Sequence, residues 1–320
     1  MTSLDLNMHL VSPNPVLRQA AADRAPHLVW LNEGLIRSTP RPEGAGAIQS
    51  TLASTPMAGR PLVFTAYLLA MTSLNFQFWS LNPAGGLVRY GLDGKVGALA
   101  MQDAFLAAWL RHFATDISDE SAVLNAALGL RRECAEKGLT HIFGDIPAKD
   151  ERMEILQEVL NPARLLSVAS CLVARAAHED ELGWPDAQLV ASLFPTAYAD
   201  PYLKKAQLAL MFIAAEWRAR PLAKPVRLDV TAAADYQLPK VLRSLGLIGY
   251  SPEAEAAVDT GRPVHQGTSL ERAVRSATVE ACALLADAWG TSIEDVDFWL
   301  WQQRNVARDA KFHLTETTHY

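Results

Sequence analysis

The sequence predicts a mainly α-helical protein, a bundle of helices with a small β-ribbon near residues 74–91. Two observations support this prediction. Most of the chain after residue 97 reads as helix-length segments that begin near Ser, Asp or Asn and stop near Gly or Pro. Residues 74–80 instead alternate between two faces, as in an extended strand. A turn follows at residues 82–86, and residues 87–91 are predicted to form the second strand of the ribbon.

The charge balance limits the class of partner. The 320 residues include 29 Lys and Arg against 35 Asp and Glu, a formal net charge of −6. Proteins that bind a nucleic-acid backbone are normally basic, because neutralising phosphates supplies most of the affinity. We therefore expect a small-molecule partner and no nucleic-acid polymer.

Three features point to a cytoplasmic protein. The cysteines, Cys134, Cys171 and Cys282, are odd in number and far apart, which fits neither a disulfide framework nor a zinc site. No apolar run approaches the roughly 20 residues that a membrane helix needs, so we expect no membrane partner. No signal-like segment opens the sequence.

The domain organisation is expected to be simple. Residues 1–60 are rich in Pro, Ser and Thr, with one short helix predicted at residues 16–22. No Pro-, Gly- or Ser-rich linker interrupts the chain after residue 60. We expect a single domain over residues 1–320, with residues 1–60 as an extension packed on it. The oligomeric state stays open.

The first strand of the ribbon carries three aromatic residues. An extended strand over residues 74–80 places Phe76 and Phe78 on one face, and Asn75, Gln77 and Trp79 on the other. The common role of such side chains is packing in the core. The functional alternative is a planar slot in which a heterocyclic base stacks.

The remaining elements are mostly helices. Capping residues mark several starts, such as Ser118, Asn161 before Pro162, and Ser251 before Pro252. Residues 246–249 are expected to form a tight turn, and the polar tail at residues 311–320 to extend over a neighbouring surface. The predicted helices cover residues 99–113, 118–136, 151–160, 163–177, the segment that begins at Lys204 or Lys205, residues 238–245, the segment after Ser251, residues 269–289 capped by Ser269, and residues 291–308.

Two lysines begin an almost wholly apolar helix. Between residues 206 and 215 only Gln207 is polar, and a helix that is apolar all round is buried. Lys204 or Lys205 therefore lies at the mouth of the core, where loss of hydration lowers the pKa of a lysine. The alternative is an exposed lysine whose stem covers apolar surface.

Asp235 stands just before the predicted helix at residues 238–245. That helix has Pro239 in its first turn and Gly246 past its end, which is typical start and stop chemistry. Asp235 is thus a candidate helix cap. A carboxylate fixed at a helix N-terminus also suits a catalytic anion, so the two roles are compatible. A buried lysine together with this aspartate favours base-removing chemistry.

Standard catalytic and metal-binding motifs are absent from the sequence. It contains no HExxH, GxSxG, Walker loop or paired CxxC. The eight histidines are scattered without metal-ligand spacing, and we interpret His313 as a hydrogen-bonded structural residue. We expect neither a metal nor a cofactor.

Several blocks of the sequence resemble the queuosine salvage protein family. They occur in the family's order and span roughly residues 60–320: LNFQFWS, GLVRYG, PAKDERMEIL, YLKKAQ, AADYQLPKVLRSLGLIGYS, VDFWLW and HLTETTHY. The resemblance implies a helical fold distantly similar to helix–hairpin–helix DNA glycosylases, and queuosine 5′-phosphate N-glycosylase/hydrolase activity.

The resemblance also implies a reaction and its residues. Water replaces queuine on queuosine 5′-monophosphate, releasing queuine for salvage in tRNA modification and ribose 5-phosphate, through an oxocarbenium-like transition state. Asp235 is implied to stabilise that cation and to orient or deprotonate the water. Lys204, in register through Gln207, is implied to keep Asp235 ionised or to contact the sugar or phosphate. The implied substrate-binding residues are Asn75, Phe76, Phe78, Trp79, Tyr236, Asp297 and Trp301.

Two other functions stay open at this point. One is a non-catalytic protein that binds queuine or another 7-deazapurine, and the other is a base glycosylase for a different nucleoside or a nucleic acid. The chain also departs from its relatives at the C-terminal HRxR block, which reads His313-Leu314-Thr315-Glu316 here. Without those two arginines the phosphate contacts, and the preference for nucleotide over nucleoside, are undetermined.

Overall fold

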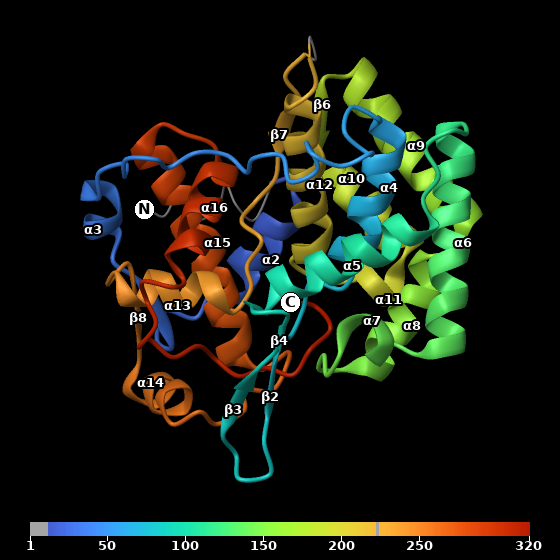
Figure 1. The fold of residues 1–320 in the computed structure, drawn as a ribbon. Coiled ribbons are helices and arrows are strands. Elements are labelled where there is room, and N and C mark those ends of the chain that lie inside the picture. The colour runs from blue at the N-terminus through green and yellow to red at the C-terminus, as the bar shows by residue number, and fades with distance from the viewer. Residues whose placement is uncertain (1–11, 222–223) are drawn as a thin grey trace.

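The computed structural model describes residues 12–221 and 224–320, and its fold is mainly α-helical, as predicted (Figure 1). The strands are short and form two-stranded sheets. In chain order the elements are α2 (Pro15–Asp23), β1 (Val29–Leu31), α3 (Glu33–Ser38), α4 (Pro61–Thr72), β2 (Trp79–Leu81), β3 (Leu87–Arg89), β4 (Gly91–Leu92), β5 (Lys95–Val96), α5 (Ala98–His112), α6 (Asp119–Lys137), α7 (Thr140–Phe143), α8 (Lys149–Val159), α9 (Pro162–His178), β6 (Glu181–Gly183), α10 (Trp184–Leu193), α11 (Pro195–Tyr198), α12 (Lys204–Arg218), β7 (Arg227–Asp229), α13 (Gln237–Ser244), β8 (Ile248–Tyr250), α14 (Pro252–Asp259), α15 (Ser269–Trp289) and α16 (Ile293–Gln303).

A larger hydrophobic core is built around helix α4. Residues 63–72 of this helix are all buried, because α4 packs against α9, α12 and α6 on different sides. The aromatic side chains of Tyr67, Phe105 and Trp109 meet in this core, with ring centroids 5.7–6.2 Å apart. Helix α4 was not predicted from the sequence.

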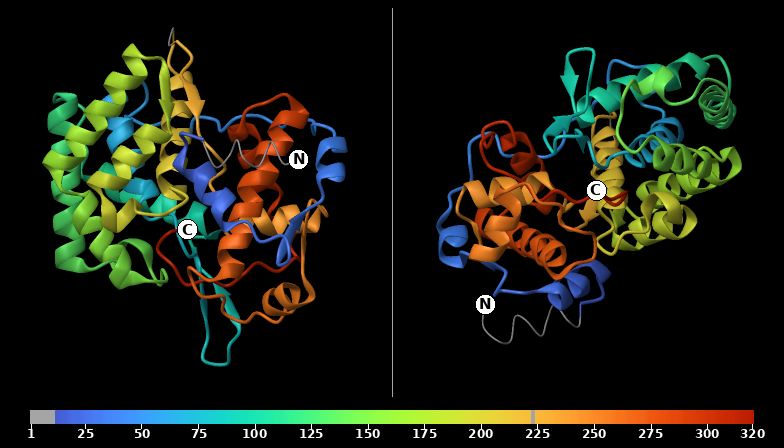
Figure 2. Two further views of the ribbon diagram at one scale, coloured as in Figure 1. Left: turned by 180° about the vertical axis from the view of Figure 1, so that it is seen from behind. Right: turned by 90° about the horizontal axis from the view of Figure 1, so that it is seen from below.

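A smaller hydrophobic core lies around helix α15. It collects apolar residues of α13, α14, α15 and α16 and of the strand pair β1–β8. The described part of residues 1–60 contributes directly: α2 and α3 pack on α15, and Val29 of β1 pairs with Tyr250 of β8. The views from behind and below show the two groups of helices side by side (Figure 2).

The two cores meet at a short segment of the chain. Ala232 packs in the smaller core, whereas Ala233 and Ala234 pack in the larger one. The next residue is Asp235. In all views the C-terminal end of the chain lies between the two groups of helices (Figures 1 and 2).

Most predicted helices are confirmed with the predicted caps. The side chains of Ser118, Asn161 and Ser251 each accept a hydrogen bond from a backbone N–H in the first turn of their helix. The short helix predicted at residues 16–22 is α2. The bounds predicted for α15, residues 269–289, are confirmed, but its cap is Thr268 and not Ser269. Helix α16 begins two residues later than predicted, at Ile293, and ends about five residues earlier, at Gln303.

Two further predictions were only partly right. The tight turn predicted at residues 246–249 is present at Gly246, which has a φ of 71°, but Ile248 and Gly249 belong to β8 and pair with β1. The strand expected over residues 74–80 is present only from Trp79 to Leu81. The β2–β3 hairpin itself exists, with Trp79 opposite Arg89, and it projects away from the helices (Figures 1 and 2).

No single helix among the described residues is long and apolar enough to cross a membrane. Helices α8 and α9 together are long and apolar enough, but the chain bends by 71° where they join.

The core around α4 generates a stability prediction. Leu68 is fully buried on α4, whereas Leu128 on α6 is 47 % exposed. We expect Leu68→Ala to lower the free energy of unfolding by about 2–5 kcal/mol, because it leaves a cavity. Leu128→Ala is the matched control and should change it by less than about 0.5 kcal/mol. Urea unfolding followed by circular dichroism measures both, and equal losses would contradict the packing described.

Candidate functional site

The carboxylate of Asp235 is fixed at the start of helix α13. Its Oδ1 accepts hydrogen bonds from the backbone N–H groups of Gln237 at 2.7 Å and Leu238 at 3.1 Å. This confirms the predicted capping role, and the N-terminal end of a helix also favours a negative charge. The side chain keeps 9 % of its surface exposed, so it can be reached from a cavity.

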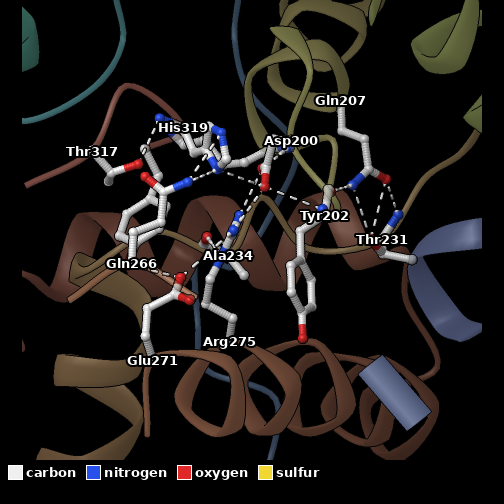
Figure 3. A network of polar contacts seen from close by, with 12 residues as sticks. Asp200, Tyr202, Gln207, Thr231, Ala234, Gln266, Glu271, Arg275, Thr317 and His319 are labelled. Carbon is white, nitrogen blue, oxygen red and sulfur yellow. Dashed lines mark hydrogen bonds and ion pairs between the residues drawn. The ribbon is translucent and has the colours of Figure 1, made fainter. Parts of the chain in front are cut away.

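The segment before Asp235 is anchored to three different helices. The N–H of Thr231 donates to Gln207 Oε1 of α12 at 2.6 Å (Figure 3). The N–H of Ala233 donates to Asp297 Oδ2 of α16 at 2.7 Å. The carbonyl of Ala234 accepts from Nε of Arg275 in α15 at 3.2 Å. The position of Asp235 therefore depends on packing across both cores.

Lys204 is buried, as the apolar helix predicted, and only 2 % of it is exposed. Its Nζ donates to the carbonyl oxygen of Asn75 at 2.9 Å and to the side-chain Oδ1 of the same residue at 3.0 Å. Burial lowers the pKa of Lys204, and the carboxylates of Asp235 and Asp297 partly oppose that change. An ammonium group has three donors, so one N–H is left for a ligand.

Two cavities meet at these residues. The first has a volume of about 350 Å³ and the second about 280 Å³. Both are lined by Asn75, Leu99, Lys204, Asp235 and Trp301. A ligand that occupies both cavities would therefore pass directly beside the carboxylate of Asp235 and the amine of Lys204.

Aromatic rings and cations line the first cavity. The ring of Tyr236 lies 4.7 Å from that of Phe312, and the guanidinium of Arg304 lies 3.4 Å from the ring centre of Trp301. The further lining residues include Phe76, Phe78, Trp79, Arg89, Lys95 and Tyr320.

The second cavity is more apolar. Leu208 and Phe212 come from α12, and Phe298 comes from α16. Asp297 is the buried carboxylate of this cavity, and burial raises its pKa to about 7. Residues 48–51 of the N-terminal part close one side, where Glu216 accepts hydrogen bonds from Ser50 and Thr51.

Three positive charges lie close together at the first cavity: Arg89 and Arg304 line it, and Lys240 contacts Arg304. Lys240 donates from Nζ to the carbonyl of Arg304 at 3.0 Å. Its pKa is lowered to about 8, first by burial and then by the charges of Arg89 and Arg304. Three cations close to one another at the wall of a cavity favour an anionic ligand.

Buried cations also explain why residues 74–78 do not form a strand. The carbonyl of Ser73 accepts from Lys205, that of Asn75 from Lys204, and those of Phe76 and Gln77 from Arg152. These carbonyls are therefore unavailable for a strand ladder. Gln77 has a φ of 32°, which breaks the alternation of faces. Consequently Asn75, Phe76, Phe78 and Trp79 all line the cavity, whereas the predicted face pattern separated them.

The C-terminal tail is buried, which corrects the expectation that it extends over a surface. His313 is fully buried and its Nε2 hydrogen bonds with the hydroxyl of Tyr320 at 3.2 Å. Burial lowers the pKa of His313 to about 3, so it is neutral, as expected of a structural histidine. Tyr320 and Phe312 line the first cavity, so the tail forms part of its wall.

All nine residues predicted for the site line one or both cavities. The sequence analysis missed Arg152, Asp200, Arg275, Arg304 and Phe312. Arg152 lies inside a recognised block and Asp200, Arg304 and Phe312 lie within three residues of one, whereas Arg275 lies between two blocks and has no such signal. Among the residues that the structure describes, no group of three or more His, Cys, Asp or Glu is placed to hold a metal ion.

Fold and site together define a helical protein with a two-part cavity beside a fixed carboxylate and a buried amine. The queuosine salvage protein family matches residues 201–320, so the resemblance seen in the sequence is confirmed. The chain is also 27 % identical over 275 residues to the queuosine 5′-phosphate N-glycosylase/hydrolase of Sphaerobacter thermophilus. That similarity covers 79 % of this chain and 80 % of the relative.

The raised pKa of Asp297 predicts a pH dependence of stability. Because its folded pKa of about 7 lies above the unfolded value near 3.9, the folded state holds the proton more tightly. Stability should therefore fall as pH rises from about 4 to about 7, by up to about 4 kcal/mol from this group. Asp297→Asn keeps an acceptor for Ala233 and should flatten that part of the profile. Urea unfolding at pH 4.5 and 7.5 tests this, and identical pH profiles would contradict it.

Proposed function

We propose that this protein is a hydrolase that cleaves the N-glycosidic bond of queuosine 5′-monophosphate and releases queuine and ribose 5-phosphate. The observation that carries the proposal is the place of Asp235. Its carboxylate is held by two backbone N–H groups at the junction of two cavities, beside the buried amine of Lys204. The family match and the similarity to a queuosine 5′-phosphate N-glycosylase/hydrolase support the choice of substrate.

The reaction needs a negative charge beside the anomeric carbon. As the bond between C1′ and the base nitrogen breaks, its electron pair leaves with the base and the ribose becomes oxocarbenium-like. Asp235 stabilises that cation and accepts a proton from the water that attacks C1′. In the net reaction, the oxygen and one proton of the water stay on C1′, and its other proton, first taken by Asp235, ends on the nitrogen of the departing base. Burial lowers the pKa of Lys204. In the proposed reaction its amine supplies a hydrogen-bond donor next to Asp235 and the substrate.

The aromatic residues suit the base. A flat heterocycle packs well against the rings of Phe76, Phe78, Trp79, Tyr236 and Trp301, which border the cavities. Asn75 contributes an amide, although its Oδ1 is engaged by Lys204. Asp297 supplies a carboxylate for the cationic amine that queuine carries, and no cofactor is required for hydrolysis.

The cations of the first cavity suit the 5′-phosphate. Arg304 and Arg89 line the cavity, and Lys240 donates a hydrogen bond to the carbonyl of Arg304. Charge-assisted hydrogen bonds from guanidinium groups to phosphate are short and strong. These residues take the place of the two arginines that the relatives carry in the block corresponding to residues 313–316.

Replacing Asp235 tests the proposed chemistry. We expect Asp235→Asn to lower kcat by about 10²–10³-fold or more, because the neutral amide no longer stabilises a cation. The fold should survive, since the amide oxygen still accepts the two capping hydrogen bonds. The matched control is Asp229→Asn, the same change at an exposed position six residues earlier. Purified proteins are incubated with queuosine 5′-monophosphate, and free queuine is followed by mass spectrometry.

Each outcome of that experiment decides between functions. Release by wild type and Asp229→Asn, with loss in Asp235→Asn, supports the hydrolase. Queuine binding without turnover by wild type would instead indicate a non-catalytic binding protein. Release from a nucleic acid but not from the mononucleotide would indicate a base glycosylase. Full activity in Asp235→Asn would show that the assigned role is wrong.

Replacing Arg304 tests the phosphate contact. We expect Arg304→Gln to reduce the ratio of kcat/KM for queuosine 5′-monophosphate over the queuosine nucleoside by about 10–100-fold, since a hydrogen bond to a charged group contributes about 1.5–3 kcal/mol. Arg308→Gln changes an exposed arginine on the following turn and should leave the ratio unaltered. An unchanged ratio in Arg304→Gln would place the phosphate elsewhere.

A further inference from the structure

Arg275 is a buried arginine at the centre of a polar network (Figure 3). Its side chain is only 2 % exposed. Its two terminal nitrogens donate to the two carboxylate oxygens of Asp200, both at 2.7 Å. The rings of Tyr202 and Tyr320 lie 4.3 Å and 4.5 Å from the guanidinium carbon. The carboxylate of Glu271 lies 3.8 Å away. These contacts leave Arg275 with little room to move.

Asp200 connects Arg275 to the helix that carries Lys204. Its Oδ2 accepts from the backbone N–H of Lys204 at 2.9 Å, and its Oδ1 accepts from that of Tyr202 at 3.2 Å. Leu203, the residue at the helix start, has a φ of 50° and supplies no side-chain cap. Asp200 therefore takes over the capping of α12, and Arg275 fixes the orientation of Asp200.

The third nitrogen of Arg275 reaches the segment that carries Asp235. Nε donates to the carbonyl of Ala234, the residue immediately before Asp235, at 3.2 Å. One guanidinium group thus contacts the cap of the Lys204 helix and the backbone next to Asp235. Arg275 itself does not line either cavity.

We propose that Arg275 is a positioning residue that sets the distance and orientation between Lys204 and Asp235. It does so through its bidentate ion pair with Asp200 and its hydrogen bond to the carbonyl of Ala234. This inference rests on the proposed function, because it assumes that Lys204 and Asp235 act on one substrate. It adds a residue that contacts no substrate and acts only through the two groups that do.

Lysine cannot reproduce this arrangement. The planar guanidinium supplies a two-pronged contact to a carboxylate and a third donor at a fixed angle, whereas an ammonium is a point charge. Arg275→Lys keeps the positive charge that Asp200 needs, so it avoids leaving a buried carboxylate without a partner. It removes the geometry while keeping the charge, which makes it the informative variant.

We expect Arg275→Lys to lower kcat on queuosine 5′-monophosphate by about 10–100-fold, because a small misplacement of reacting groups is costly. KM should change by less than about 3-fold, since no substrate contact is removed. The control is Arg175→Lys, in which another arginine that pairs with a buried aspartate, Asp186, is changed away from the site. It should keep the wild-type kcat. Both variants are assayed well below their unfolding temperatures, which are measured in parallel.

Amide hydrogen exchange of the peptide covering residues 230–238 tests the anchor without turnover. Arg275→Lys should speed exchange there by about 10-fold, whereas Arg175→Lys should not. A wild-type kcat in Arg275→Lys, or unchanged exchange at residues 230–238, would overturn the inference. Faster exchange in a protein whose wild type releases no queuine would leave the anchor in place and overturn the proposed function instead.

Discussion

The burial of positive charge is the constraint on which the rest of this structure depends. Lys204, Lys205 and Arg152 are all almost completely buried, and burial lowers the pKa of each. A buried cation is costly unless hydrogen bonds satisfy it. These three cations take the main-chain carbonyls of residues 73, 75, 76 and 77, which are therefore not available to pair as a strand. The result is an irregular wall that turns several aromatic residues toward one cavity.

The carboxylates of the site depend on the same principle. Asp235, Asp297 and Asp200 are each held by backbone N–H groups, and Asp200 also binds Arg275. Burial alone would raise the pKa of Asp200, but the Arg275 guanidinium keeps it below its usual range. Asp297 has no such partner, and its pKa is raised to about 7. The pKa values of Asp200 and Asp297 therefore shift in opposite directions, because a guanidinium lies against only the first of these carboxylates.

Local chemistry was readable from the sequence, and distant contacts were not. Ser118, Asn161 and Ser251 were predicted as caps because a cap involves only residues of the adjoining turn. The capping role of Asp235 was predicted for the same reason, and the burial of Lys204 was predicted from the apolar residues that follow it in its own helix. The prediction of a strand at residues 74–78 was wrong because Arg152, far along the chain, takes the carbonyls of Phe76 and Gln77. Arg275 was missed because its function needs Asp200 and Ala234, which only tertiary packing brings together.

The charge distribution fits a small anion better than a polyanion. The chain has a net charge of −6, while Arg89 and Arg304 line the first cavity and Lys240 hydrogen bonds to the carbonyl of Arg304. Binding of a nucleic acid gains most of its affinity from neutralising many phosphates, which an acidic chain with one small group of cations does not favour. A single phosphate bears its charge at one point and needs only that group of cations. Because Arg89 and Arg304 line the same cavity as Asp235, the proposed reaction needs only one small ligand, whose phosphate meets these cations and whose ribose lies beside the carboxylate.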